Sequence, residues 1–98
     1  MKTEEIAKIH SKIDELNKLS KEEITIIANI YFTQTRKVDN SKYTIVPVIN
    51  LKITANRNRR DDFKILEMPL NCFNIFYYGL KSILEHEKNS FLHIIDYF

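Results

Sequence analysis

The sequence predicts an α+β domain: an N-terminal helix, a three-stranded antiparallel meander and a C-terminal helix that covers the sheet. Two patterns predict it. Between Tyr43 and Ala55, every odd position except Pro47 is a large apolar residue or alanine, and a period of two is typical of a strand on a core. Farther along, the period becomes helical and gives one apolar stripe: Phe73, Phe76, Tyr77, Leu80, Ile83 and Leu84. We expect a single domain, with helix in 1–20, sheet in 21–70, and helix and tail in 71–98.

The first helix is predicted to begin near Thr3, which can cap it, with Glu4 and Glu5 at its positive end. A narrow apolar stripe follows at steps of three and four: Ile6, Ile9, Ile13, Leu16 and Leu19. A helix of this kind can lie on its own sheet or pair with a helix of a partner. The pattern does not choose between the two.

The segment 20–35 has two interpretations. Ser20 and Glu23 match the capping box of a helix. From Ile24 to Phe32, however, apolar residues alternate and β-branched residues are frequent, which favours a strand. We prefer the strand. The helical alternative would turn residues 3–32 into a helical hairpin.

Turns are predicted by composition at 37–41 and 56–62, with a third strand at 63–68. Pro69 and Asn71 then introduce the last helix, which we expect to reach about Lys88 before an apolar tail at 91–98. Gly79 lies inside this helix, where glycine costs about 1 kcal/mol relative to alanine. We expect another backbone to pack closely against it.

Composition limits the classes of function. Of the 98 residues, 44% are hydrophobic and 29% are charged, the net charge is +2, and Cys72 is the only cysteine. No apolar run approaches the roughly 20 residues of a transmembrane helix, and a lone cysteine suits a reducing compartment, so we expect a cytoplasmic protein. The histidines are too dispersed for a metal site, and a single glycine provides no phosphate-binding loop. We therefore expect no enzyme, catalytic residue, metal or cofactor.

Two surfaces are candidates for partner contacts. Val46 and Val48 make part of the second face of the middle strand apolar, as Ile27 and Tyr31 do on the first strand. A sheet that needs cover on both faces of so short a chain indicates dimerisation. The predicted dimer or partner interface comprises Val46, Val48, Phe73, Phe76, Tyr77, Tyr78 and Leu80. Of these, Tyr78 falls off the helical stripe and is the best candidate for an exposed aromatic.

The second candidate is the basic turn that contains Arg57, Arg59 and Arg60, with Lys52 nearby in the sequence. Three arginines on a hairpin tip can bind phosphates of nucleic acid or of an anionic lipid. Asp61 and Asp62 follow directly and partly neutralise the tip. The alternative is an ordinary solvated turn.

The strand Val48-Ile49-Asn50-Leu51-Lys52-Ile53 and the run from Phe63 to Tyr78 resemble the COMM domain of the COMMD proteins. In that family a strand leads into a helix that a Phe opens, with further apolar residues at turn spacing. The resemblance covers about half of the chain. It implies an obligate dimer in which two sheets pack face to face with interlocked helices. It also implies a scaffold role in an assembly linked to endosomal trafficking and ubiquitin ligases, without catalytic residues.

The leading hypothesis from the sequence is thus a non-enzymatic assembly module that forms a homo- or heterodimer through its sheet and last helix. An alternative is a small phage or mobile-element protein that inhibits a host nucleic-acid-handling complex, suggested by the small size and the basic middle of the chain. A third is direct binding of RNA or anionic lipid by the turn from Arg57 to Arg60.

Overall fold

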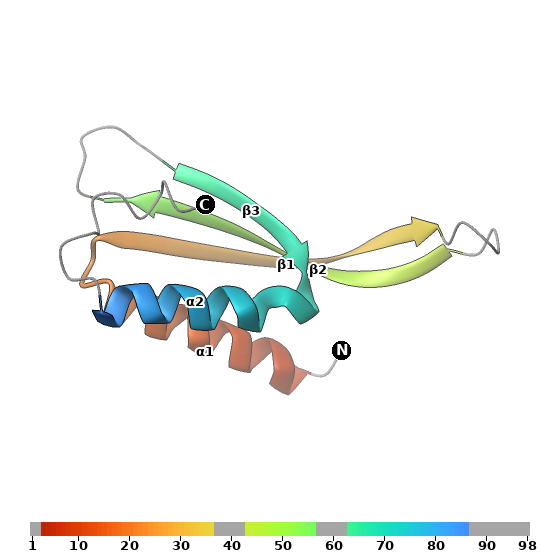
Figure 1. Cartoon of the computed structure of the whole chain (residues 1–98). Coiled ribbons are helices and arrows are strands. Elements are labelled where there is room, and N and C mark those ends of the chain that lie inside the picture. The colour runs from red at the N-terminus through yellow and green to blue at the C-terminus, as the bar shows by residue number, and fades with distance from the viewer. Residues whose placement is uncertain (1–2, 37–42, 57–62, 87–98) are drawn as a thin grey trace.

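The computed structural model describes residues 3–36, 43–56 and 63–86. The elements follow in the order α1 (Thr3–Leu19), β1 (Ile24–Arg36), β2 (Tyr43–Ala55), β3 (Phe63–Pro69), a short 3₁₀ turn η1 (Leu70–Cys72) and α2 (Phe73–His86). The strands form one antiparallel sheet in the order β1-β2-β3 (Figure 1). The α+β fold predicted from the sequence is confirmed. So is the strand preferred after residue 20.

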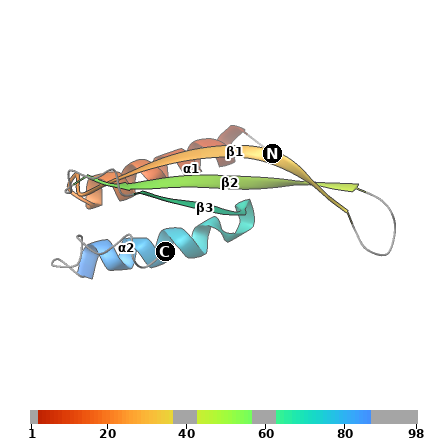
Figure 2. The same ribbon diagram turned by 90° about the horizontal axis from the view of Figure 1, so that it is seen from above.

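The molecule has two layers, because both helices lie on the same face of the sheet (Figure 1). Seen from above, α1 runs beside β1 and α2 runs on the side of β3 (Figure 2). The helices also contact each other. The sequence left open whether the first helix would need a partner helix, and in the structure it packs on its own chain.

The core lies between these layers. On β2, Ile49, Leu51 and Ile53 are fully enclosed, and their neighbours on β1 are Ile30, Ala28 and Ile26 in that order. The alternation seen in the sequence therefore has a direct cause, since only one side of the strand meets the helices. The helices contribute Ile13, Leu16, Phe73, Tyr77, Leu80 and Leu84 to the same cluster.

The connection between α1 and β1 corrects the capping-box interpretation. Lys21 and Glu22 have positive φ angles of 52° and 67°, so the chain leaves the helix there and reverses direction. The buried Ser20 hydroxyl lies 2.7 Å from the Asn17 carbonyl and 3.1 Å from the Ile24 carbonyl. Ser20 thus closes the end of α1 and does not open a new helix.

Asn17 ties α1 to the outer edge of β1. Its side-chain Nδ2 donates to the Ile26 carbonyl at 3.1 Å, and its Oδ1 accepts from the Ile26 N–H at 2.7 Å. The amide therefore bonds Ile26 as a neighbouring strand would. An edge strand has unpaired backbone groups that can recruit another chain, and Asn17 occupies those of Ile26.

Gly79 does not have the role predicted for it. A Cβ built on Gly79 meets no atom of the described residues within 4 Å, so the prediction that another backbone packs closely against Gly79 is wrong for this part of the chain. The residue lies on the exposed side of α2, and the helix continues through it.

The two longer strands extend beyond the helical layer. β3 pairs with β2 only from Val48 to Thr54, whereas β1 pairs with β2 along its whole length. The ends formed by Phe32–Arg36 and Tyr43–Pro47 therefore project as a two-stranded ribbon (Figures 1 and 2). We call this part the arm.

Candidate protein-binding surface

Both described helices, α1 and α2, lie on one face of the sheet, and we call the other face the open face. The strand register places Ile27, Lys52 and Ile65 side by side in one row across all three strands. The side chain of Ile27 is 60% exposed and that of Ile65 is 57% exposed. Phe63, which is 48% exposed, lies in the adjacent row. Large apolar side chains from both outer strands are thus gathered at one end of this face.

Lys52 is the charged member of the row. Its Nζ lies 4.7 Å from the centroid of the Phe63 ring, within the range of a cation–π contact. The lysine leans across apolar neighbours in the way typical of long amphipathic side chains. The sequence placed Lys52 with the basic turn; in the structure it belongs to the open face.

The opposite charge on this face comes from Glu67, one row farther along β3. Tyr31 hydrogen-bonds to Glu67, and this bond, with some desolvation, raises the pKa of the Tyr31 phenol. A lysine and a glutamate therefore lie one row apart on a surface that also exposes isoleucine and phenylalanine.

The structure divides the predicted interface residues into two groups. Phe73, Tyr77 and Leu80 belong to the buried core cluster of the single chain. Val48 is buried as well, although it shares its side of β2 with Lys52 and so lies on the open face. The stripe on α2 that the sequence offered to a partner is covered by the chain's own sheet and by α1. Val46 and Phe76 are half-buried and Tyr78 is exposed.

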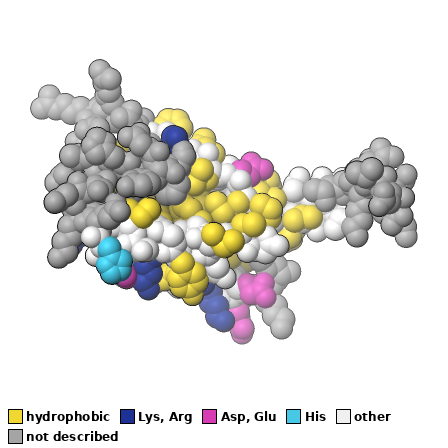
Figure 3. Space-filling model, in the orientation of Figure 1, with side chains coloured by type: hydrophobic (Ala, Val, Ile, Leu, Met, Phe, Trp, Pro, Cys, Tyr) yellow, Lys and Arg dark blue, Asp and Glu magenta, His cyan; other side chains and the backbone are white. Residues whose placement is uncertain are grey.

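The outward side of α2 carries a second apolar surface. Ile75 is 78% exposed, and Tyr78 is also largely exposed. In the orientation of Figure 1, hydrophobic side chains form a band across the middle of the molecule (Figure 3). Sequence reasoning missed Ile75, Ile65 and Phe63. The available signal was the odd positions of the third strand, which are apolar at 63 and 65 and lie opposite to its core-facing even positions.

Arg57, Arg59 and Arg60 lie outside the described residues. Contact of that turn with nucleic acid or lipid stays a prediction from the sequence.

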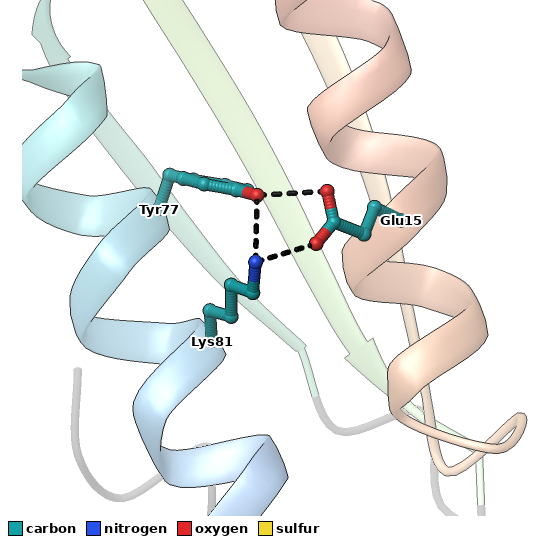
Figure 4. A network of polar contacts seen from close by, with 3 residues as sticks. All are labelled: Glu15, Tyr77 and Lys81. Atoms are coloured by element: carbon teal, nitrogen blue, oxygen red, sulfur yellow. Dashed lines mark hydrogen bonds and ion pairs between the residues drawn. The ribbon is translucent and has the colours of Figure 1, made fainter.

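One cluster of hydrogen-bonded polar side chains is a candidate for a catalytic site, and it joins the two helices (Figure 4). The Tyr77 hydroxyl donates to Glu15 Oε2 at 2.7 Å, and Lys81 Nζ lies 2.9 Å from Glu15 Oε1. Lys81 also donates to the Tyr77 hydroxyl at 3.4 Å. We call these three residues the helix clamp.

Electrostatics within the clamp stabilise charges that are already present. The hydrogen bonds from Lys81 and Tyr77 lower the pKa of Glu15. The bond to Glu15 raises the pKa of Lys81 and also that of Tyr77. A general acid or base needs a pKa moved toward neutrality. These shifts go the other way, so the clamp is an ion pair that holds α1 against α2.

Other chemical centres were sought in the parts of the chain that the structure describes. Within residues 3–36, 43–56 and 63–86, no three His, Cys, Asp or Glu side chains come together in a group that could hold a metal ion. Over the same residues, no helix is both long and apolar enough to cross a membrane.

No protein-family model matches the chain, and neither a curated protein nor a solved structure is significantly similar to it.

Proposed function

We propose that the chain is a non-enzymatic assembly module that forms a homodimer through the open face of its sheet. The observation that carries the proposal is the row of Ile27, Lys52 and Ile65, which the helices leave uncovered. Large apolar side chains that cluster on a surface mark sites of protein association far more often than scattered ones do.

Burial explains why this face favours association. Ile27, Phe63 and Ile65 each keep about half or more of their side chain in water. Removing apolar surface from water contributes roughly 25 cal/mol per Å². A partner sheet packed on this face would recover that free energy, as the two layers of a β-sandwich do.

The charges on the open face favour a second copy of the chain as the partner. A two-fold dimer brings the same patch of both subunits together, so the patch has to be complementary to itself. The open face carries one basic residue, Lys52, and one acidic residue, Glu67, in neighbouring rows. When two copies face each other in opposite directions, Lys52 of each can meet Glu67 of the other. The COMM-domain resemblance supports the same arrangement, because it implies sheets that pack face to face.

The first test compares two exposed isoleucines. Multi-angle light scattering at micromolar concentration should give the mass of a dimer for the unmodified protein and of a monomer for Ile65→Lys. Ile75→Lys makes the same change on the outward side of α2 and should remain dimeric. A monomeric unmodified protein would overturn the proposal. Dissociation by Ile75→Lys alone would move the interface to α2.

The second test uses the two charges. Lys52→Glu should weaken the dimer at least about tenfold, because like charges would then face each other. Adding Glu67→Lys to the same chain restores opposite charges and should recover most of the affinity. If the double variant is as weak as the single one, Lys52 and Glu67 do not meet across the interface.

A further inference from the structure

A groove lies beneath the base of the arm, on the face of the sheet opposite to the open face. Its volume is about 620 Å³. Its apolar lining includes Ile9 of α1, Phe32 of β1, Ile45 and Pro47 of β2, and Leu70 of η1. Phe32 and Ile45 are each more than half exposed. The dimer proposed above does not use this surface.

Beside this groove, no strand of the described residues pairs with the outer edge of β2 at Ile45 and Pro47. β3 stops pairing with β2 at Val48, where Pro69 is its partner. Residues 45–47 of β2 therefore have β1 on one side and no strand of the described chain on the other. An exposed strand edge can bind an extended peptide by adding it to the sheet.

The direction of the backbone groups along this edge follows from three residues. The N–H and C=O of Ile26 both bond Asn17, so these backbone groups point away from β2. In the antiparallel ladder, the N–H and C=O of its partner Ile53 must then point toward β3. The backbone groups of the other odd residues of β2 point to the same side. Pro47 agrees, since proline is tolerated in a strand where its nitrogen faces a free edge. Pro69 likewise has its nitrogen on the side away from β2.

It follows that the N–H and C=O of Ile45 and the C=O of Pro47 point out of the free edge. The pairing of β1 with β2 runs through this region in unbroken register, so no bulge reverses the direction. A strand laid here would continue the line of β3 beyond Pro69. Alternate side chains of such a strand would enter the groove between Ile9, Ile45 and Leu70.

The charged residues at the groove indicate the chemistry of the guest. They are Glu5, Lys8 and Lys12, all on α1. Lys12 donates to Asn74 Oδ1 at 2.9 Å and lies 5.1 Å from the centroid of the Tyr77 ring. Two of the three charges are thus positive, at the border of an apolar floor.

We propose that this groove and the free edge of β2 bind an extended segment of a partner protein in which apolar and acidic side chains alternate. The segment adds as a short strand beside residues 45–47. Its apolar side chains fill the groove, and its acidic groups lie near Lys8 and Lys12. A module that dimerises through one face would in this way recruit a client on the other.

Fluorescence anisotropy with the full chain tests this proposal. The probe is a labelled synthetic heptapeptide in which Val alternates with Glu, compared with a Val/Lys heptapeptide of the same pattern. We expect saturable binding of the acidic peptide and at least about tenfold weaker binding of the basic one. An acidic peptide with N-methyl groups on alternate residues loses edge hydrogen bonds and should bind at least about tenfold more weakly in one of the two methylation registers. Equal affinity for the acidic and basic peptides, or no binding of either, would overturn the proposal.

Matched variants locate the site. Lys8→Glu should weaken binding of the acidic peptide by roughly fivefold, the effect of an exposed charge contact. Lys18→Glu makes the same charge change on α1 away from the groove and should have no effect. Equal effects of the two variants would mean that net charge alone governs binding, which contradicts a site. Chemical shift changes at Ile45 that depend on protein concentration without peptide would assign the edge to a second copy and overturn the proposal.

The peptide assay is independent of the dimer assay. It can be repeated on Ile65→Lys, which removes the proposed dimer contact from the opposite face. Retained peptide binding by that variant would show that recruitment does not depend on the dimer. Failure of either proposal therefore leaves the other standing.

Discussion

The two faces of the sheet differ in burial and in composition, although the same strands form both. On β2, Ile49, Leu51 and Ile53 are fully enclosed by the helices, while Lys52 and Thr54 between and beyond them point to the open face. On β1 and β2 the covered face is apolar where the helices lie, and on β3 its one charged residue is Lys64. The open face mixes apolar rows with Lys52 and Glu67. The covered face forms the permanent core of the domain. The open face has the mixed apolar and charged composition of a protein-binding surface.

This difference has a practical consequence for reading small domains. Alternation in a strand identifies which residues share a face, but burial depends on what the helices cover. Ile27 on β1 and Ile53 on β2 lie within the same sheet, yet Ile27 is largely exposed and Ile53 is enclosed. Stability and association should therefore respond to different substitutions in the same strands.

The largest expected effect is on the covered face. Leu51→Ala should lower the free energy of unfolding by about 2–5 kcal/mol, because it removes buried methyl groups and leaves a cavity among enclosed neighbours. Ile27→Ala should change it by no more than about 0.5 kcal/mol. Urea denaturation measures both, on the Ile65→Lys background so that association does not contribute.

Similar losses for Leu51→Ala and Ile27→Ala would contradict the distinction between the faces. A large loss for Ile27→Ala in the monomeric background would mean that its side chain is covered within one chain. The proposed dimer surface would then shrink to β3.

The next effect concerns how the helical layer is held on the covered face. Asn17→Ala removes both hydrogen bonds to Ile26 and leaves the backbone groups of β1 without them. We expect a loss of about 1–2 kcal/mol in the free energy of unfolding and faster hydrogen exchange at the Ile26 amide. Asn29→Ala is the matched change on the exposed side of β1 and should alter neither quantity appreciably. Unchanged exchange at Ile26 in Asn17→Ala would show that water replaces the side chain without cost.

The sequence predicted most of the fold because its signals were local and repeated. Alternation from Tyr43 to Ala55 reflects one buried side of β2, and the same logic decided correctly for a strand after Ile24. The pattern at Ser20 and Glu23 failed because a capping box specifies side-chain types only. The left-handed turn at Lys21 and Glu22 converts the same residues into the end of a helix.

The candidate surfaces could be predicted only in part, since periodicity shows that residues share a stripe without showing what covers it. Phe73 and Tyr77 were placed both on the apolar stripe that covers the sheet and in the predicted partner interface. In the structure, α1 and the sheet pack around α2 and bury both side chains. Asn17 gave no signal, because a polar residue on a helix is ordinary until its neighbour is known. Ile65 belonged to a recognisable strand, but the direction of its side chain mattered only once the helices were placed on one face.

The smallest expected effect lies in the helix clamp, at the outer border of the covered layer. The pKa of Glu15 is lowered in the folded chain by Lys81 and Tyr77. A carboxylate with a lowered folded pKa contributes stability above its unfolded pKa, and this contribution is lost as the pH falls through the folded pKa. We therefore expect the clamp to stabilise the chain near neutral pH and to stop doing so in acid. The contribution should be modest and should decrease with salt, because the pair is exposed to solvent.

Urea midpoints at about pH 7 and about pH 3 measure the effect. Glu15→Gln should lower the midpoint slightly near neutrality and leave it almost unchanged in acid, so the variant depends less on pH than the unmodified protein does. Asp14→Asn removes a neighbouring negative charge from the same helix and serves as the control. If both variants reduce the pH dependence equally, overall charge repulsion governs it and the clamp does not. If only Glu15→Gln does so, the two helices are joined by a specific ion pair, and the covered layer is held at its border as well as by its core.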